Sequence, residues 1–363
     1  MTGRVAIIGR RGTAVSAVAA TVVLAAFGGT AAAAPSAPAE TTRVLFRDDF
    51  TSGFDTSSKW MLQPTKTPTG TLAHGDGVAI TSGDGLTVTP TGRNPRTGEP
   101  AFASTNGQDS TEWGGGTSDH LKWLAQPRES SVNGFPVPEQ GSLTCTSRMG
   151  VRTLGVDRHP FGRAAVSDPQ SDPRLASATL ISVDHENHSV ANFSVTNTQI
   201  FAVYERLRVD EHSDFAGFNY SIPVAKTRPG KINDLQIRYD QGGKRVSWLV
   251  NGTKVLSTDR IGTLAFPREH LVIDEGGTEE QVTSRNVQCL LSTGNLLDGA
   301  GRPQDRDKRG LVQLAKDPGH YFAPLKGEPH RQEFLDTRSL PTNRLWGQGV
   351  ILNQRLFEMT TEE

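Results

Sequence analysis

The chain has 363 residues, and its 38 Lys and Arg side chains nearly balance 39 Asp and Glu, which leaves a formal charge of −1. Its 38 Gly and 21 Pro favour many turns over long helices, and the composition excludes a collagen, a coiled coil or a polytopic membrane protein. A near-neutral charge without a basic run argues against a nucleic-acid partner, because such binding relies on clustered cations.

The first 33 residues have the pattern of a secretory signal. Arg4, Arg10 and Arg11 form a positively charged start, and an apolar run follows at 14–27. That run is shorter than the ~20 residues needed to span a bilayer, and small residues at 31–34 then provide a cleavage site. We therefore expect cleavage after Ala33, a leader at 34–42, a single domain at 43–363, and a secreted protein without membrane association.

From residue 43 onward, short apolar runs alternate with turn-forming clusters, which is typical of a β-sandwich or barrel. The clearest pattern is at 235–256, where Gly242-Gly243 and then Asn251-Gly252 separate three alternating runs and predict a three-strand meander. A short helical turn is expected at 119–125. Further strands are expected at 44–46, 86–89, 179–183, 191–195, 199–207, 218–224, 270–273 and 349–357.

Three segments carry a resemblance to concanavalin A-like jelly rolls. FRDDF at 46–50, followed by GFDTS at 53–57 and Trp60, resembles the start of these proteins. VSWLVNGTKV at 246–255 resembles one of their hairpins, and LFEM at 356–359 resembles the last strand, which pairs with the first. The resemblance implies an all-β jelly-roll sandwich of two antiparallel sheets.

A second resemblance joins the segments 204–207, 274–279 and 346–349 to an uncharacterised family of exported actinobacterial proteins. No activity follows from it. The jelly rolls named above include family 16 glycoside hydrolases, whose E-x-D-x-x-E strand places three carboxylates on one face. This chain lacks that motif, and its nearest approach, Asp184-His185-Glu186, has only two acids. A hydrolase of that type is therefore not expected.

Metal and cofactor sites are also not expected. His185 and His188 are three residues apart and would point to opposite faces of a strand. By analogy with the jelly-roll fold alone, Asp48 and Asp49 could hold a structural calcium ion with nearby backbone carbonyls.

The strand at 199–207 provides the main catalytic candidate, Glu205. Regular alternation places Glu205 in one row and Tyr204 and Arg206 in the other. Because its row is otherwise apolar, Glu205 either forms a structural ion pair with an Arg or serves a site with a raised pKa. Tyr204 would join it only if a bulge turned the chain. Asp274, in the acidic stretch at 274–280, is the third catalytic candidate.

Ligand-binding candidates are Trp113, Trp123, Arg206 and Asn219. Trp113 and Trp123 flank a Gly-rich segment and could stack against a sugar, or could simply anchor a loop. The two cysteines, Cys145 and Cys289, are expected to form a disulfide in an exported protein, with two separately buried thiols as the alternative.

Three functions fit these features. The first is a secreted jelly roll that binds or acts on a ligand, with carbohydrate as the leading class, in a cleft on the concave face. The second is a non-hydrolytic cyclase, isomerase or lyase of specialised metabolism that uses one acid–base pair. The third is a structural or adhesive surface module.

Overall fold

The computed structural model describes residues 41–67, 69–105, 107–108, 120–128, 134–208, 213–317 and 319–363. The expected signal at 1–33 and the candidate Trp113 lie outside these residues. From Thr41 to the C-terminus the chain belongs to one compact unit. In the ranges given above, no helix has the length and apolar character needed to cross a bilayer.

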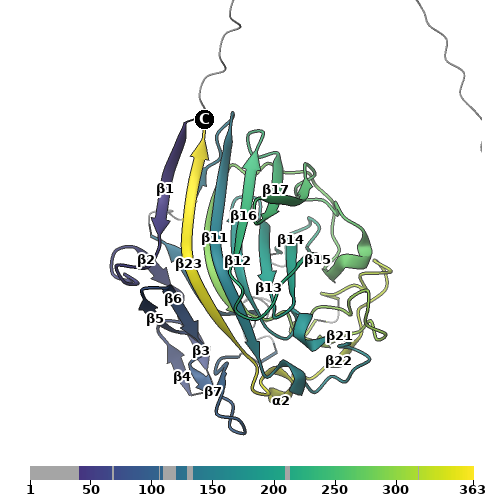
Figure 1. Ribbon diagram of the computed structural model, residues 1–363. Coiled ribbons are helices and arrows are strands. Elements are labelled where there is room, and N and C mark those ends of the chain that lie inside the picture. Colours follow the sequence, from purple (N-terminus) through teal and green to yellow (C-terminus); the bar gives the residue numbers. More distant parts are fainter. Residues whose placement is uncertain are drawn as a thin grey trace, which may run out of the picture. The chain divides into compact units, whose positions relative to one another are not determined.

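Two large antiparallel sheets form this unit (Figure 1). The first sheet has the order β18 (Thr253–Thr258), β17 (Arg245–Val250), β16 (Asn233–Asp240), β11 (Ser142–Leu154), β23 (Gly349–Glu362), β6 (Gly85–Thr89) and β5 (Val78–Ser82), and β1 (Thr42–Asp48) also pairs with β23. The second sheet has the order β19 (Leu271–Asp274), β15 (Phe218–Lys226), β14 (Gln199–Arg206), β13 (Ser189–Val195), β12 (Ser177–Asp184), β20 (Asn286–Gly294), β9 (Leu121–Pro127) and β2 (Trp60–Leu62), and β10 (Phe135–Pro136) also pairs with β20. The expected all-β jelly-roll sandwich of two antiparallel sheets is confirmed.

Smaller elements complete the chain. Short strand pairs are β3 (Thr65–Thr67) with β4 (Gly70–Leu72), β7 (Gly92–Arg93) with β8 (Pro100–Ala101), and the parallel pair β21 (Gly310–Val312) with β22 (Phe334–Asp336). The helical pieces are η1 (Val156–Arg158), η2 (Pro169–Ser171), η3 (Arg268–His270) and α2 (Pro341–Arg344).

The strands expected from the sequence are present, including the meander β16–β17–β18. Its second turn has positive φ at both central residues, 51° at Asn251 and 78° at Gly252, as a two-residue hairpin requires. The first and last strands pair, as the resemblance implied. The helical turn expected at 119–125 is wrong for 121–125, because this segment begins strand β9 and pairs with β20.

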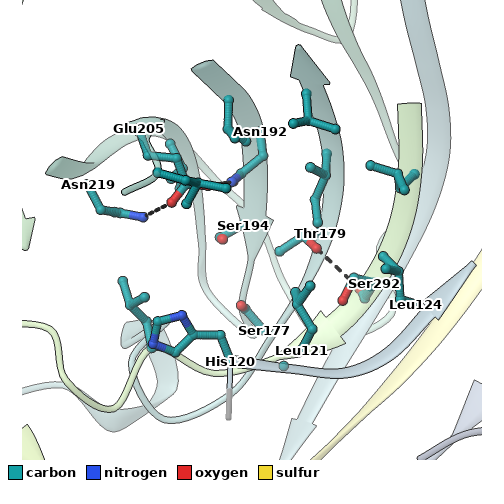
Figure 2. Close-up of a pocket in the computed structure, with 18 of the residues that line it drawn as sticks. His120, Leu121, Leu124, Ser177, Thr179, Asn192, Ser194, Glu205, Asn219 and Ser292 are labelled. Atoms are coloured by element: carbon teal, nitrogen blue, oxygen red, sulfur yellow. Dashed lines mark hydrogen bonds between the residues drawn. The ribbon is translucent and has the colours of Figure 1, made fainter. Parts of the chain in front are cut away.

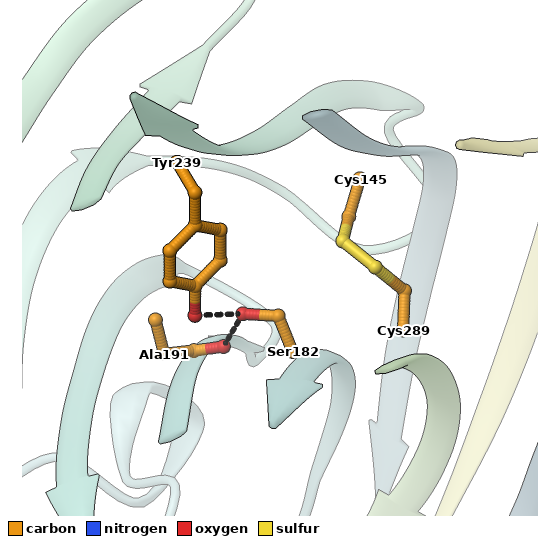
Figure 3. The surroundings of a disulfide bond; sticks show 5 residues. All are labelled: Cys145, Ser182, Ala191, Tyr239 and Cys289. Atoms are coloured by element: carbon orange, nitrogen blue, oxygen red, sulfur yellow. Dashed lines mark hydrogen bonds between the residues drawn. A yellow bond between two sulfur atoms is a disulfide. The ribbon is translucent and has the colours of Figure 1, made fainter. Parts of the chain in front are cut away.

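The core lies between the two sheets and contains most of the large aromatic side chains. Trp60 packs 5.1 Å, centroid to centroid, from both Phe46 on β1 and Phe357 on β23, so it supports the paired terminal strands. The expected disulfide between Cys145 on β11 and Cys289 on β20 is confirmed, and it joins the two sheets (Figure 3).

A buried ion cluster fixes the loops beside the second sheet. The guanidinium of Arg174, fully buried, lies 2.7 Å from a carboxylate oxygen of Asp172 and 2.7 Å from one of Asp305. The carbonyl oxygen of Arg174 accepts a hydrogen bond from the backbone N–H of Leu296. Because unpaired buried charges are costly, this cluster holds the segment after β20 in one place.

Candidate functional site

A cleft of about 320 Å³ lies on the outer face of the second sheet, the face turned away from the first sheet (Figure 2). Strand alternation produces it. On β12, Thr179, Ile181 and Val183 line the cleft, while Ala178 and Leu180 face the core. The other strand residues that line the cleft are Leu121, Leu124, Gln126, Ser177, Val190, Asn192, Ser194, Val203, Glu205, Asn219, Ser221, Gln288, Leu290, Ser292 and Gly294.

Glu205 lies at the centre of a polar cluster in this cleft. Asn219 is directly opposite on β15 and donates from Nδ2 to Oε2 of Glu205 at 2.5 Å. Asn192 on β13 donates from Nδ2 to Oε1 at 3.0 Å. We call Glu205, Asn192 and Asn219 the Glu205 cluster; its two amides hold both oxygens of one carboxyl group.

The charge state of Glu205 follows from its surroundings. Burial raises the pKa of Glu205 to about 7, and the hydrogen bonds from Asn219 and Asn192 and the nearby His120 oppose this rise only in part. No salt bridge joins Glu205 to an Arg or Lys in the described ranges. The structural ion pair considered from the sequence is therefore not found, and the carboxyl group changes its protonation state near neutral pH.

A second polar cluster reaches the same cleft through His120. The imidazole Nε2 of His120 lies 2.8 Å from Oδ1 of Asp298, and the Tyr321 hydroxyl donates to Oδ2 of Asp298 at 3.0 Å. Burial alone would raise the pKa of Asp298, but His120 and the hydrogen bond from Tyr321 outweigh it and hold the pKa below its usual range. We call His120, Asp298 and Tyr321 the His120 cluster.

Two amide side chains of the cleft have polar atoms without a protein partner. Oδ1 of Asn192 and both Oδ1 and Nδ2 of Asn295 make no hydrogen bond within the described part of the chain, although both residues are buried. The backbone N–H of Asn295 donates to the carbonyl oxygen of His120, which places this amide beside the His120 cluster. Such orphaned groups are costly in a fold unless water or a ligand satisfies them.

Of the residues chosen from the sequence, Glu205 and Asn219 are brought together in the cleft. Tyr204 is not, because no bulge occurs beside it and alternation turns it into the core. Its hydroxyl accepts a hydrogen bond from the backbone N–H of Gly262 and lies 3.1 Å from the carbonyl oxygens of Arg260 and Thr263. Tyr204 therefore braces the loop after β18 and does not reach a ligand in the cleft.

Three other candidates also lie elsewhere. Trp123 is fully buried in the core near Phe54, so it cannot stack against a ligand. Arg206 points to the side opposite Glu205, where it pairs with Glu280 and lies over the ring of Phe215. Asp274 ends β19 outside the cleft, pairs with Arg268 and accepts from the N–H of Gly276.

Sequence reasoning missed Asn192, Asn295 and the His120 cluster. Asn192 had a usable signal, since it alternates with Phe193 in an expected strand and so had to face away from the core. His120 and Asp298 are far apart in the sequence, and only the pairing of β9 with β20 brings them together.

No group of three or more potential ligand residues suited to a metal ion is present among the residues described. At the expected calcium site, the carboxylate of Asp48 accepts hydrogen bonds from the backbone N–H of Phe50 and from Trp60 Nε1, and lies 3.2 Å from Lys59 Nζ. A calcium ion would have to displace these donors from the carboxylate of Asp48. The calcium site therefore stays a prediction, and one of its expected ligands is already bound by protein groups.

Several solved structures are similar to this chain. They include an endo-β-1,3-glucanase from Pyrococcus furiosus (TM-score 0.41, 9% identity, 89% of this chain and 96% of that one) and a β-1,3-1,4-glucanase (lichenase) derived from a mouse hindgut metagenome (TM-score 0.37, 10% identity, 86% and 97%). A κ-carrageenase from Pseudoalteromonas carrageenovora in complex with an oligotetrasaccharide is a third (TM-score 0.36, 9% identity, 92% and 100%). At this level of similarity no activity transfers to this chain.

A sequence relative is the uncharacterized protein L829 of Acanthamoeba polyphaga mimivirus, 24% identical over 273 residues. The match covers 59% of this chain and 60% of the length of that relative. Because the relative is viral, the resemblance to actinobacterial proteins stays a prediction. The sequence model of a family described as "Family of unknown function (DUF6081)" matches residues 47–363, so the chain belongs to that family.

Proposed function

We propose that the cleft binds a small, neutral, hydroxylated molecule, with carbohydrate as the leading class. The observation that carries the proposal is the Glu205 cluster, in which two amides hold a carboxyl group that lies on the cleft face without a cation. A sugar hydroxyl both donates and accepts, so it can meet a carboxyl oxygen and an amide at once. The orphaned atoms of Asn192 and Asn295 offer further partners.

The apolar part of the cleft supports the same class of ligand. Ile181, Val190 and Val203 also line the cleft and can pack against the C–H face of a ring. The volume of about 320 Å³ is at the lower end of the ~300–1,000 Å³ typical of small-molecule pockets. A ligand of one or two rings is therefore favoured over a long polysaccharide chain.

The charges of the cleft favour a neutral ligand over an anionic one. Its described lining contains Glu205, His120 and His185 as titratable groups, and neither Arg nor Lys. A phosphorylated sugar or a uronate would therefore meet no fixed positive charge, and its desolvation would go uncompensated.

We also propose that the protein acts outside the cell. The disulfide between Cys145 and Cys289 supports this, because such bonds persist in oxidising compartments. N-terminal sequencing of exported protein should begin at or near Ala34. An intact Met1 on exported protein would contradict the expected cleavage.

The binding proposal is tested by thermal unfolding in the presence of glucose, galactose, N-acetylglucosamine and cellobiose, with glucuronate and glucose 6-phosphate as charged comparisons. At least one neutral sugar should raise the melting temperature in a concentration-dependent way, and its charged counterpart should not.

The matched variants are Glu205→Gln and Asn219→Ala in the cleft and Glu269→Gln outside it, where the carboxylate is exposed. The first two should lose the sugar-dependent shift while Glu269→Gln keeps it. If no neutral sugar shifts the parent protein, or if Glu205→Gln keeps the full shift, carbohydrate binding at this cluster is wrong.

A further inference from the structure

We infer that the Glu205 cluster recognises a vicinal diol, which is a pair of hydroxyl groups on neighbouring carbons of one ligand, and that the Glu205 carboxylate holds both hydroxyls at once. The inference rests on the proposed binding of a small neutral molecule and names the part of that molecule which the cleft reads. It is carried by the two hydrogen bonds that join the amides of Asn192 and Asn219 to the two oxygens of Glu205 (Figure 2).

The three side chains of the cluster come from three adjacent strands. Asn192 is on β13, Glu205 is on β14 and Asn219 is on β15, where it is the direct partner of Glu205 in the sheet. Neighbouring strands are about 4.8 Å apart, so the two amides and the carboxyl group are within reach of one small ligand. The donor–acceptor distances of 3.0 Å from Asn192 and 2.5 Å from Asn219 tie them into one unit.

The carboxyl group of Glu205 can accept two more hydrogen bonds. An ionised carboxylate has about four acceptor sites, and within the described part of the chain each oxygen of Glu205 accepts a single hydrogen bond. Every other residue of β14 is buried, whereas Glu205 is partly exposed and lines the cleft. Each of its oxygens can therefore receive one further donor from a ligand.

The two amides supply donors that match these acceptors. Each Asn Nδ2 has two N–H groups, and among the described residues its single partner is an oxygen of Glu205. One ligand hydroxyl can thus donate to Oε1 of Glu205 and accept from Asn192, while its neighbour donates to Oε2 and accepts from Asn219. Because the two oxygens of one carboxylate are close together, they fit hydroxyls on neighbouring carbons and not hydroxyls on opposite sides of a ring.

Two further features of this face favour a ring with more than two hydroxyls. Val203 pairs with Asn192 and Val190 pairs with Glu205 in the sheet register, so apolar side chains flank the polar cluster and can pack against a C–H face. Oδ1 of Asn192 has no hydrogen-bond partner within the described ranges, although this residue is only 6% exposed. It can accept from a third hydroxyl, which a pyranose has and a simple diol lacks.

Recognition of the diol requires the ionised form of Glu205. A proton on either oxygen would replace one of the two acceptors by a donor. Burial raises the pKa of Glu205 to about 7, so the ionised form changes from the minor to the major population between pH 6 and pH 8. Since a neutral diol has no group that titrates in this range, its affinity should rise with pH.

The other charged groups around Glu205 can be separated from it. His120, just before β9, and Glu275, just after β19, both act on its charge. His185 lines the cleft and its imidazole is bonded to an amide oxygen on β20, whereas Arg206 points to the opposite face. The flanking strands β13 and β15 place no charged side chain in the cleft lining. Because an imidazole also titrates in this pH range, the pH effect is read as the difference between the parent and a variant at position 205.

The test compares isomers of cyclohexanediol, which are neutral, equal in composition and different only in the placement of their hydroxyls. NMR titration of the full chain gives a Kd for the cis-1,2, trans-1,2, 1,3 and 1,4 isomers. At least one 1,2 isomer should bind at least tenfold more tightly than the 1,3 and 1,4 isomers, because hydrogen bonds to a charged group are strong. 2-Methoxycyclohexanol keeps only one of the two hydroxyls and should lose this advantage. Equal Kd values for the 1,2 and 1,4 isomers, or no binding of either 1,2 isomer up to its solubility, would overturn the inference.

Three variants assign the preference to the cluster. Glu205→Gln keeps the shape of the side chain but replaces one acceptor by a donor, so it should abolish the preference for the 1,2 isomer, and Asn219→Ala should weaken it. Glu269→Gln, where the carboxylate is exposed, should keep it. The Kd of the parent for the preferred isomer should fall about tenfold from pH 6 to pH 8 as the ionised fraction of Glu205 rises, and that of Glu205→Gln should not change.

Melting temperatures check that each variant is folded. If Glu205→Gln keeps the preference, or if the parent Kd is the same at both pH values, the carboxylate does not hold the diol. If neutral sugars bind through Glu205 but the isomers bind alike, recognition of the diol is wrong and carbohydrate binding stands. If a 1,2 isomer is preferred through Glu205 but no sugar binds, recognition of the diol stands and the carbohydrate assignment fails.

Discussion

Trp248 on β17 of the first sheet donates a hydrogen bond of 2.9 Å from its indole Nε1 to the backbone carbonyl oxygen of Asn192 on β13 of the second. The side chain of Asn192 then points the other way, into the cleft, and donates to Glu205. The core thus fixes Asn192, a residue of the candidate site, through its backbone. Successive side chains of a strand point to opposite faces, so the side chain of Asn192 can face the cleft while its backbone carbonyl bonds to the core.

Trp248→Phe tests this link. Phenylalanine keeps much of the ring in the core but removes the indole N–H, so the Asn192 carbonyl loses a donor in a dry environment. We expect the free energy of unfolding to fall by about 1–3 kcal/mol, measured by urea denaturation. Amide hydrogen exchange should also speed up in β13 around Asn192. Unchanged protection there would mean that this hydrogen bond does not restrain the strand.

Glu205→Gln should change how stability depends on pH. The pKa of Glu205 is raised from 4.5 to about 7 in the folded chain, so between these values the folded state holds a proton that the unfolded state has lost. Stability of the parent therefore falls as pH rises through this range, by roughly 3 kcal/mol at most. Glutamine does not ionise and removes this loss.

Melting temperatures at pH 4 and pH 8 measure the effect. From pH 4 to pH 8, the melting temperature of Glu205→Gln should rise relative to that of the parent. The exposed acid-to-amide change Glu269→Gln should show no such trend. A parent–variant difference that is the same at both pH values would mean that Glu205 titrates normally. The cleft would then not suppress its ionisation.

The position of Glu205 was predictable from the sequence because a strand has only two faces. Strand alternation correctly placed Phe201, Val203 and Glu205 in one row and Tyr204 in the other. Val203 and Glu205 line the cleft, and Tyr204 lies in the core. The partner of Glu205 was not predictable in the same way. Asn219 faces it only because of the register between β14 and β15, which a bulge at Ile200–Phe201 shifts.

Trp123 and His120 illustrate what the sequence could not decide. A Gly-rich segment before Trp123 suggested an exposed aromatic ring, but the residue lies in strand β9, whose pairing with β20 directs it into the core. His120, at the edge of the same segment, becomes a cleft residue because Asp298 reaches it after β20. Long-range pairing determines both outcomes, and local pattern carries no information about it.

Tyr204→Phe provides a contrast within the same strand. The hydroxyl of Tyr204 accepts from Gly262 N–H and lies against two carbonyl oxygens in the buried side of the sheet. Its loss should lower the free energy of unfolding by about 1–3 kcal/mol and leave sugar binding in the cleft unchanged. If Tyr204→Phe abolished sugar binding while it remained folded, the assignment of Tyr204 to the core alone would be wrong.

The Cys145–Cys289 bond should contribute strongly to stability, because it closes a loop across a sequence separation of 144 residues and joins the two sheets. The chain-entropy model gives about 4–5 kcal/mol for a loop of this size. We expect the free energy of unfolding of the double variant Cys145→Ala/Cys289→Ala, measured by urea denaturation, to be lower than that of the parent by this amount. The parent protein with its disulfide reduced should have the same free energy of unfolding as the double variant. Thiol titration of denatured, unreduced parent should find no reactive cysteine. Two reactive thiols, or equal stability of parent and double variant, would show that the bond does not form or does not hold the sheets together in solution.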